Sequence, residues 1–471
     1  MPNRWRLASA LALPVLGCAI WLRGGLAAAS LQDPQEPPGG KPAAKLIPVP
    51  TGAIGSADVD QDEIRGVIDG LVACGTRNSL SSWTDPKHGI GCGRDRIVAR
   101  LESIAKETGG QLEVKVDHFQ ATSPRTSGQP VPLENVVAVL PGTDPALAKT
   151  AFVVSGHFDS MPSNVMDATS DAPGADDDAS GTAVSIECAR LLSSRRPAGG
   201  YRATLVFAAV SGEEQGLLGG TRLLEYLQQL GYTVGGMLDN DIVGADFAPG
   251  APHRVRVFSG GGPDGVDSES RELARTVDDI DSPEAVRLVF RVDRLGRGGD
   301  HMPFVEAGLP AVRFTEPLED YHHEHQTPRV ENGIQYGDLP QYLNFGFLAS
   351  VVRDNAEVLR QLALAPARPD EAALSGAVSP NAVVSWRAPN DPDRAGFEIL
   401  WRETTAPRWS VFDFVTEGGE RVLEGVSTDN HFFAVRAVGA NGARSIAVPA
   451  LPKRRQHPPA PPPGVQVKPG R

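Results

Sequence analysis

The stretch TLVFAAVSGEEQG, residues 204–216, decides how the chain folds. Its first seven residues, Thr204 to Val210, form an almost continuous apolar run, which predicts a strand buried on both faces of a parallel sheet. The polar segment 211–216 follows directly and contains two neighbouring glutamates, Glu213 and Glu214. Because sites in open α/β sheets form beyond the carboxyl ends of the strands, these glutamates are candidates for a functional site.

Strand and helix patterns alternate on both sides of this stretch. Runs rich in β-branched residues predict strands, and apolar residues at helical spacing predict helices. The predicted strands are 135–140, 150–155 and 255–258, and the predicted helices are 179–194, 217–230 and 347–364. Alternating strands and helices indicate an α/β fold, a three-layer α/β/α domain with a mostly parallel mixed sheet. We place this domain at residues 60–366.

The pattern changes after residue 366. Short strand-like runs at 382–386, 396–402 and 431–438 are separated by turn residues, and no long helical pattern appears. This predicts a small C-terminal β-sandwich over residues 367–452. The segment resembles a fibronectin type III module, with Trp386 as a candidate core residue.

The two ends of the chain differ in composition from its body. Residues 1–29 combine arginines at positions 4 and 6, an apolar run from Leu7 to Leu22 and small residues at 27–29, which is typical of a secretory signal. Cys18 is a possible lipid-attachment site within it. A linker rich in Pro and Gly is predicted at 30–59 and a disordered tail at 453–471. The protein is therefore expected to be exported, to the periplasm or the extracellular space.

Charge and cysteine content narrow the possible partners. Acidic residues outnumber basic ones, 58 to 45, and the formal charge is −13. This argues against nucleic acid or an anionic membrane as the main partner. We also expect no membrane span beyond the signal. Four cysteines are too few for a disulfide scaffold. Cys74 and Cys92 could form one disulfide, and Cys188 is expected to be a buried thiol.

Several further segments carry acids or histidines at the ends of predicted elements. They are His157-Phe-Asp159 after a strand, Asp176-Asp-Asp178 before a helix, Asp239-Asn-Asp241 after an apolar pair, and Tyr321-His-His-Glu-His-Gln-Thr327. Taken alone, each segment also has an ordinary structural interpretation. The aspartates before the helix, for example, could serve only to cap it. Together, histidines with Asp and Glu favour zinc over harder cations.

The chemistry expected from this set is metal-assisted hydrolysis. Of two neighbouring glutamates, one can bind a metal while the other acts as general base. Asp159 could hold the second ring nitrogen of His157. Competing chemistries fit less well, because the chain has no G-x-S-x-G elbow and no H-E-x-x-H helix. The segment 296–299 lacks the Lys-Ser/Thr of a phosphate loop.

In this order, these segments resemble the di-zinc exopeptidase family of bacterial leucyl aminopeptidases and aminopeptidase Y, which also includes glutamate carboxypeptidases and glutaminyl cyclases. The resemblance covers about residues 60–365. It implies two zinc ions, with Glu213 as general base. Asp159, because it could hold the His157 ring, is taken as a supporting catalytic residue. The implied zinc ligands are His157, Asp177 (shared by both ions), Glu214, Asp241 and His323.

Some of these assignments have alternatives. Asp241 is preferred to Asp239 because Asp-Ile-Val-Gly matches the family's pattern. The family tends to place Asp four residues after the last histidine ligand, and Thr327 stands there, so His325 and, more weakly, His322 are alternatives to His323. Asp300-His301 matches a family pair that supports the site.

The resemblance implies a secreted metallo-aminopeptidase that acts on peptides with a free N-terminus. One alternative is carboxypeptidase or glutaminyl-cyclase chemistry on the same scaffold. Another is a non-catalytic binding protein in which the β-sandwich makes the contacts.

Overall fold

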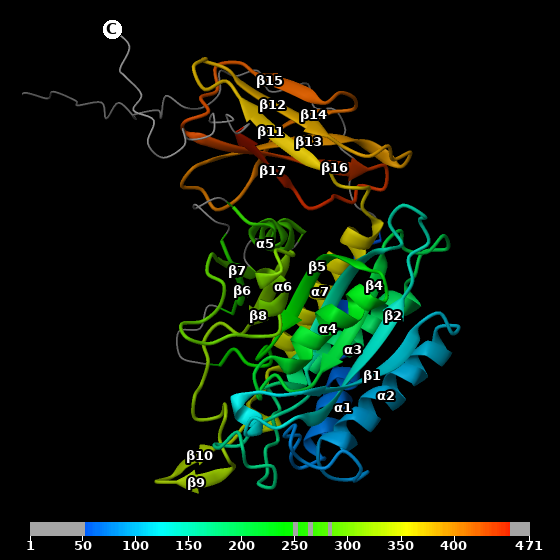
Figure 1. The fold of residues 1–471 in the computed structure, drawn as a ribbon, viewed down its shortest axis with the longest axis vertical. Coiled ribbons are helices and arrows are strands. Elements are labelled where there is room, and N and C mark those ends of the chain that lie inside the picture. The colour runs from blue at the N-terminus through cyan, green and yellow to red at the C-terminus, as the bar shows by residue number, and fades with distance from the viewer. Residues whose placement is uncertain (1–51, 248–252, 262–266, 281–284, 453–471) are drawn as a thin grey trace, which may run out of the picture. The chain divides into compact units, whose positions relative to one another are not determined.

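The computed structural model describes residues 52–247, 253–261, 267–280 and 285–452. The predicted signal, Cys18, most of the predicted linker and the predicted tail lie outside the described residues. The described part contains a large mixed sheet with helices on both faces and a separate C-terminal sheet (Figure 1). The predicted α/β fold class is therefore confirmed.

The large sheet has eight strands in the order β1-β2-β4-β3-β5-β8-β6-β7. The strands are β1 (Glu113–Ala121), β2 (Val131–Leu140), β3 (Thr150–His157), β4 (Thr204–Val210), β5 (Thr233–Asn240), β6 (Val255–Phe258), β7 (Val286–Val289) and β8 (Ala311–Thr315). The four central strands β4, β3, β5 and β8 are parallel to one another, while β1, β2 and β6 introduce antiparallel pairs. The carboxyl ends of the central strands consequently meet at one edge.

In the described part of the chain, seven helices accompany this sheet. They are α1 (Gln61–Val72), α2 (Ile90–Glu107), α3 (Ala179–Ser194), α4 (Leu218–Gln229), α5 (Glu269–Ile280), α6 (Met302–Glu306) and α7 (Phe345–Leu364). Short 3₁₀ turns lie at Ser56–Asp58, Pro124–Thr126 and Pro340–Tyr342, and a small hairpin joins β9 (Arg329–Glu331) to β10 (Ile334–Tyr336). Of these, α3 has the predicted bounds, and α4 and α7 differ from prediction by one or two residues.

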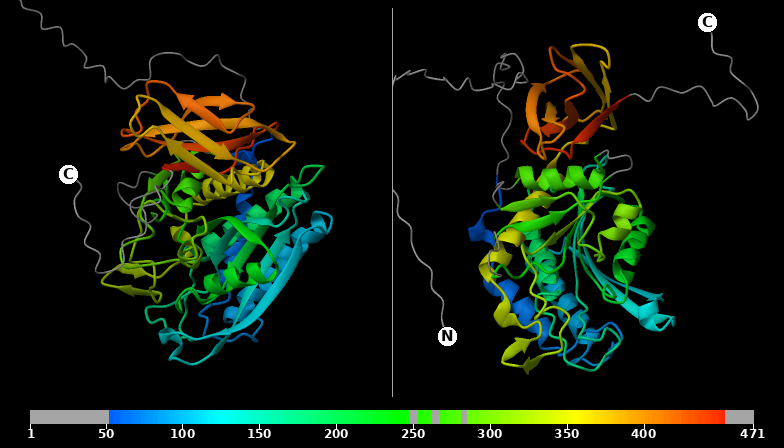
Figure 2. Two further views of the ribbon diagram at one scale, coloured as in Figure 1. Left: turned by 45° about the horizontal axis from the view of Figure 1, so that its top comes forward. Right: turned by 90° about the vertical axis from the view of Figure 1, so that its left-hand side faces the viewer.

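Two hydrophobic cores lie on opposite faces of the sheet. Alternate residues of β4 enter different cores: Leu205, Phe207 and Ala209 face one, and Val206, Ala208 and Val210 face the other. The first core is shared with α1, α2, α3, α5 and α7, and the second with α4 and α6 (Figure 2). A strand between two helical layers must be apolar on both sides, which explains the continuous apolar run of β4.

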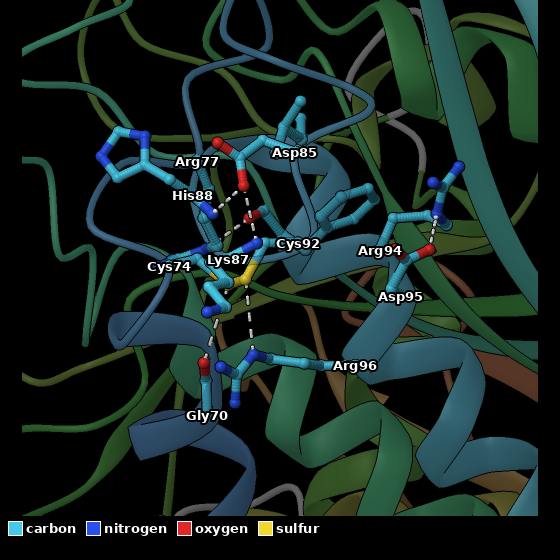
Figure 3. Close-up of a disulfide and its surroundings, with 12 residues drawn as sticks. Gly70, Cys74, Arg77, Asp85, Lys87, His88, Cys92, Arg94, Asp95 and Arg96 are labelled. Carbon is cyan, nitrogen blue, oxygen red and sulfur yellow. Dashed lines mark hydrogen bonds and ion pairs between the residues drawn. A yellow bond between two sulfur atoms is a disulfide. The ribbon is translucent and has the colours of Figure 1, made fainter.

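A disulfide ties the end of α1 to the start of α2. Cys74 and Cys92 are bonded, and Arg77 lies three residues beyond Cys74 (Figure 3). Cys188 in α3 is a free, buried thiol, as expected. Residues at the end of the predicted linker also pack on the domain, since Ile54 is buried and its backbone N–H donates to Glu357 Oε2 at 2.9 Å.

The C-terminal sheet contains seven strands in the order β14-β13-β16-β17-β11-β12-β15. They are β11 (Glu371–Ser375), β12 (Ala382–Arg387), β13 (Arg394–Glu403), β14 (Ser410–Val415), β15 (Glu420–Leu423), β16 (His431–Gly439) and β17 (Val448–Pro452). The sheet curls because β17 pairs antiparallel with β16 and parallel with β11. Trp386 is buried in its core against Phe397. The resemblance to a fibronectin type III module stays a prediction.

The C-terminal sheet contacts α5 through a group of ion pairs and hydrogen bonds, here called the α5 junction. Its acids come from α5 and the residues just before it, and most of its arginines come from the C-terminal sheet. The pairs are Asp267 with Arg275 and Arg402, Glu272 with Arg275 and Trp409, Asp278 with Arg408, and Asp279 with Arg436. Among the described residues, no helix has both the length and the apolar character that crossing a membrane requires.

Candidate metal centre

The predicted site residues converge at the carboxyl edge of the central strands. His157 is the last residue of β3, Glu213 and Glu214 follow β4, and Asp241 directly follows β5. Asp177 comes from the turn before α3, and His325 lies in the segment after β8. The parallel topology thus explains why residues almost 170 positions apart in the chain lie together.

One group of potential metal ligands consists of His157, Asp177 and Asp241. Nε2 of His157 lies 3.1 Å from Asp177 Oδ1 and 3.8 Å from Asp241 Oδ1. All three side chains are buried. Burial alone would lower the pKa of His157, but contacts with Asp159 and Asp177 raise that pKa well above its usual value.

A second group consists of Asp177, Glu214 and His325. Nε2 of His325 lies 2.9 Å from Asp177 Oδ2 and 3.5 Å from Glu214 Oε1. Oε1 of Glu214 is buried without a hydrogen-bond partner. The charges of Glu214 and Asp177 outweigh the effect of burial and raise the pKa of His325 to about 10. Both imidazole positions therefore favour a positive charge.

Asp177 belongs to both groups, so the five residues form one unit, here called the Asp177 cluster. Oδ1 of Asp177 faces His157 and Oδ2 faces His325. Its backbone N–H donates to Asp338 Oδ2 at 2.7 Å, and that of Asp176 donates to both Asp338 oxygens. Asp338, which the sequence analysis did not identify, therefore fixes the turn that presents the shared carboxylate.

The other two members of the aspartate triplet have structural contacts. Asp178 caps α3 by accepting from Gly181 N, and it also accepts from the backbone N–H of His157. Asp176 accepts from Gly244 N at 2.6 Å. Capping and ligand positioning are thus divided among adjacent residues.

Asp159 contacts His157 as predicted. Its Oδ1 lies 3.4 Å from His157 Nδ1, and its backbone oxygen lies 3.2 Å from the same nitrogen. The Asp159 carboxylate also accepts from the backbone N–H groups of Glu213 and Glu214 at 3.3 and 3.2 Å. One buried carboxylate therefore orients the β3 histidine and the glutamates after β4 together.

Glu213 belongs to neither ligand group but lies beside both. Burial, together with the charges of Asp241, Asp177 and Asp159, raises its pKa to about 7, although His157 opposes this shift. A carboxylate with a pKa near neutrality is suited to accept and return a proton. The two glutamates therefore differ in position, as the sequence analysis expected of a ligand and a base.

Arg313 is a contact of the site that the sequence analysis missed. This fully buried arginine of β8 places Nη2 at 2.8 Å from Asp241 Oδ2 and Nη1 at 3.4 Å from Asp293 Oδ2. Burial would raise the pKa of Asp241, but Arg313 and His157 lower it below its usual value. The sequence signal for this contact was a charged residue, Arg313, among the apolar residues Ala311, Val312 and Phe314.

The Asp300-His301 pair contacts Asp239 and Gly220 and belongs to neither ligand group. His301 Nδ1 lies 3.3 Å from Asp239 Oδ2, and Asp239 also accepts from Ser155 Oγ. Asp300 accepts from the backbone N–H of Gly220. Asp239 is thus held away from the ligand groups, and Asp241 occupies the position that the sequence analysis preferred.

His323 does not lie in the Asp177 cluster, in contrast to the first choice from the sequence. Its ring stacks on Tyr342 with centroids 3.6 Å apart, and its Nδ1 lies 3.7 Å from Asp320. His325, the stated alternative, takes the predicted place, while His322 pairs with Asp320 on the surface. The backbone of His325 is left-handed, with φ 50°, and its ring contacts Asp177 and Glu214. The spacing of the three histidines in the sequence does not predict this backbone conformation.

Arg77 connects the residue after His157 to the loop that precedes Asp177. Its guanidinium donates to the backbone oxygens of Phe158, Pro173 and Gly174, and the side chain is fully buried. The Cys74–Cys92 disulfide anchors the segment that carries Arg77 (Figure 3). The disulfide, which the sequence left open, thus helps to support the site.

The donor set of the Asp177 cluster fits zinc. Each group offers one imidazole nitrogen and carboxylate oxygens, a mixture that zinc prefers to the all-oxygen sites of harder ions. The contact of Asp159 with Nδ1 of His157 leaves Nε2 free to bind. Oε1 of Glu214, which is buried and has no hydrogen-bond partner, is positioned to bind a cation at the second group.

A family profile and two sequence relatives agree with this chemistry. A profile described as Peptidase family M28 matches residues 135–337, a range that includes every member of the Asp177 cluster. A probable zinc metalloprotease of Leptosphaeria maculans is 38% identical over 418 residues, covering 84% of this chain and 95% of that protein. One from Pyrenophora teres f. teres is 37% identical, covering 87% and 89%. The solved structure of the Legionella pneumophila LapA aminopeptidase matches with a TM-score of 0.48 and 19% identity, over 66% of this chain and 73% of that one.

Proposed function

Because the chain is a zinc metallopeptidase that belongs to peptidase family M28, we propose that it removes residues from the N-termini of peptides, using two zinc ions and Glu213 as general base. The observation that carries this proposal is the shared Asp177, whose two oxygens face two separate ligand groups. A single-ion site has no need of a second group of this kind.

The two ligand groups define where the ions would bind. His157, Asp177 and Asp241 would hold one, and Asp177, Glu214 and His325 would hold the other. Two zinc ions held there would polarise the scissile carbonyl and lower the pKa of an attacking water. Arg313 would keep Asp241 ionised and oriented, and Asp159 would do the same for the His157 ring.

Glu213 moves the proton in this scheme. Its carboxylate takes a proton from the attacking water and later returns it to the nitrogen of the leaving amine. The backbone N–H of Glu213 donates to Asp159, which fixes the start of the Glu213–Glu214 segment. Because Asp159 also contacts the His157 ring, it fixes the positions of Glu213 and Glu214 relative to that ring.

The charge around the centre favours a substrate's free amine over a free carboxylate. Acids outnumber cations near the Asp177 cluster, and a protonated α-amine is attracted to such a region. A carboxypeptidase would need a cation to receive the C-terminal carboxylate. Arg297, a nearby candidate, is paired with Glu319 at 2.5 Å and is not offered to a substrate. Aminopeptidase chemistry is therefore the first choice over carboxypeptidase or cyclase chemistry.

The test is a panel of aminoacyl 4-nitroanilides, each with a free or an acetylated N-terminus, assayed with the metal-loaded full chain. We expect release of nitroaniline from the free substrates alone, abolished by a chelator and restored by zinc. Cleavage of acetylated substrates, or no cleavage by a chain that contains zinc, would contradict aminopeptidase activity. C-terminally free peptides and N-terminal glutamine peptides in the same panel detect the two alternative activities.

We also propose that the protein is exported and that its C-terminal sheet is a fibronectin type III-like module. The charged, apolar and small-residue order of 1–29 supports export, and the Cys74–Cys92 disulfide suits an oxidising compartment. Fractionation of the source cells, with mass analysis of the mature N-terminus, tests export and separates cleavage after residue 29 from lipid attachment at Cys18. Protein found only in the cytoplasm would contradict it.

A further inference from the structure

A small cavity rich in acids lies next to the turns that carry Asp177 and His325. Its volume is about 120 Å³, and we call it the acidic cavity. Its acidic wall includes Asp176 and Glu324, which precede the cluster members Asp177 and His325 in the chain, and Glu316. Its apolar wall includes Phe247, Leu318 and Tyr342. The mechanism proposed above uses none of these six side chains.

Glu316 is buried in this wall without a full set of partners. Glu316 follows β8 and is 2% exposed. Its side chain interacts with that of Asp176, but its Oε2 has no hydrogen-bond partner. Neither carboxylate oxygen of Glu324 has a hydrogen-bond partner, although Arg297 lies 3.6 Å from one of them. Buried carboxylates are normally satisfied, so these oxygens indicate a cationic ligand that enters the cavity.

The shape of the cavity favours an organic cation over a metal ion. Among the described residues, the groups whose donor atoms come within 4.8 Å of one another are the two groups of the Asp177 cluster, and the acids of this cavity form no such group. A bare ion would therefore not be enclosed. A flexible side chain with an apolar stem and a charged end fits better, because Leu318 and Phe247 are partly exposed apolar residues at the cavity wall.

We propose that the acidic cavity receives the side chain of the residue to be removed and that it selects lysine or arginine. This rests on the proposed aminopeptidase function. With the substrate's scissile carbonyl at the Asp177 cluster, the side chain of the N-terminal residue reaches the adjacent cavity. Its methylene groups lie along Phe247, Leu318 and Tyr342, and its cationic end pairs with Glu316 and Glu324. Glu316 is thus a specificity-determining residue.

The experiment compares the 4-nitroanilides of lysine and norleucine, which differ in the terminal charge at nearly constant length. For the metal-loaded full chain we expect kcat/KM to be at least about tenfold higher for lysine. Glu316→Gln should lower the ratio of kcat/KM for lysine to kcat/KM for norleucine by about tenfold or more. In Glu316→Asp the carboxylate stays but the side chain is one methylene shorter, so this variant should give an intermediate ratio. The exposed hairpin variant Glu331→Gln is the control and should leave both rates unchanged.

A direct binding measurement covers the case in which the Glu316 variants do not fold. Lysinamide should inhibit the wild-type enzyme at least about tenfold more strongly than norleucinamide. Equal rates and equal inhibition for the two side chains, or an unchanged ratio in folded Glu316→Gln, would overturn the basic-residue preference while leaving the aminopeptidase proposal intact. No chelator-sensitive cleavage of any free aminoacyl nitroanilide would overturn both.

Discussion

Two of the dense groups of buried charge in the described part of the chain, the α5 junction and the Asp177 cluster, are balanced in opposite ways. At the α5 junction, Asp267, Glu272, Asp278 and Asp279 each contact an arginine. Around the Asp177 cluster, acids predominate, and oxygens of Glu214, Glu316 and Glu324 lack hydrogen-bond partners. Balanced buried charges fix one structural element against another, whereas unbalanced ones are positioned to bind a cation.

This difference leads to opposite expectations for the two groups. Removing a charge from the Asp177 cluster or its neighbours should reduce activity and leave stability nearly unchanged. Removing a charge from the α5 junction should reduce stability and leave activity nearly unchanged.

The largest expected effect is that of Glu213→Gln. Loss of the general base should lower kcat by about a thousandfold, while the bound zinc and the melting temperature stay near wild-type values. Steady-state kinetics with metal analysis and calorimetry test this. The exposed α4 variant Glu225→Gln is the control, and near-normal turnover of Glu213→Gln would remove Glu213 from the base role.

The corresponding change at the junction is Arg402→Met. The Arg402 side chain is 5% exposed and pairs with Asp267, so its loss leaves a buried acid with less counter-charge. We expect the free energy of unfolding to fall by about 3 kcal/mol with kcat/KM within about twofold of wild type. Urea unfolding measures the first quantity. Arg387→Met, at a 68% exposed position with surface partners, should cost less than about 1 kcal/mol. Equal losses in the two variants would contradict a structural role for the junction.

Titration of the junction should be visible in the pH dependence of stability. Burial raises the pKa of Glu272 to about 7, against the opposing effect of Arg275 and Trp409. Between its unfolded pKa and pH 7 the folded state therefore holds the proton more strongly, so stability falls as pH rises. Relative to Glu272→Gln, wild type should lose about 2 kcal/mol from pH 5 to pH 6.5. Parallel pH profiles of the two proteins would contradict this assignment.

The smallest effect is expected for His323→Ala, at the border of the site. This ring stacks on Tyr342 and lies outside the Asp177 cluster, so its loss should cost about 1 kcal/mol of stability and leave metal content unchanged. His325→Ala, two residues away, should instead lose one of the two ions. If His323→Ala lost an ion and His325→Ala kept both, the assignment of the last ligand would be reversed.

Much of the fold was predictable because the patterns that specify it are local. The apolar run of β4 and the helical spacing of α3 identify a strand and a helix without knowledge of their partners. The parallel order of such strands then brings the residues after β3, β4 and β5 to one edge, which is why His157, Glu214 and Asp241 were predictable as neighbours. The aspartate triplet was also found, although only the structure divides its members among capping, sharing and backbone contacts.

The remaining site residues depend on contacts that no local pattern records. Three histidines within five residues are equivalent by spacing, and the backbone turn at His325 and the stacking of His323 on Tyr342 decide between them. Asp338 reaches the Asp177 turn from 161 positions away, and Arg313 is identified as a partner of Asp241 only when β5 and β8 are paired. Long-range pairing therefore limits what the sequence alone can specify.

The most direct test of this account is the zinc content of the intact chain, measured by native mass spectrometry for wild type and Asp177→Asn. Because both ligand groups contain Asp177, the account predicts two zinc ions per wild-type chain and none in the variant. A wild-type chain that holds a single ion at saturating zinc, or an Asp177→Asn chain that keeps two, would contradict a centre built on one shared carboxylate.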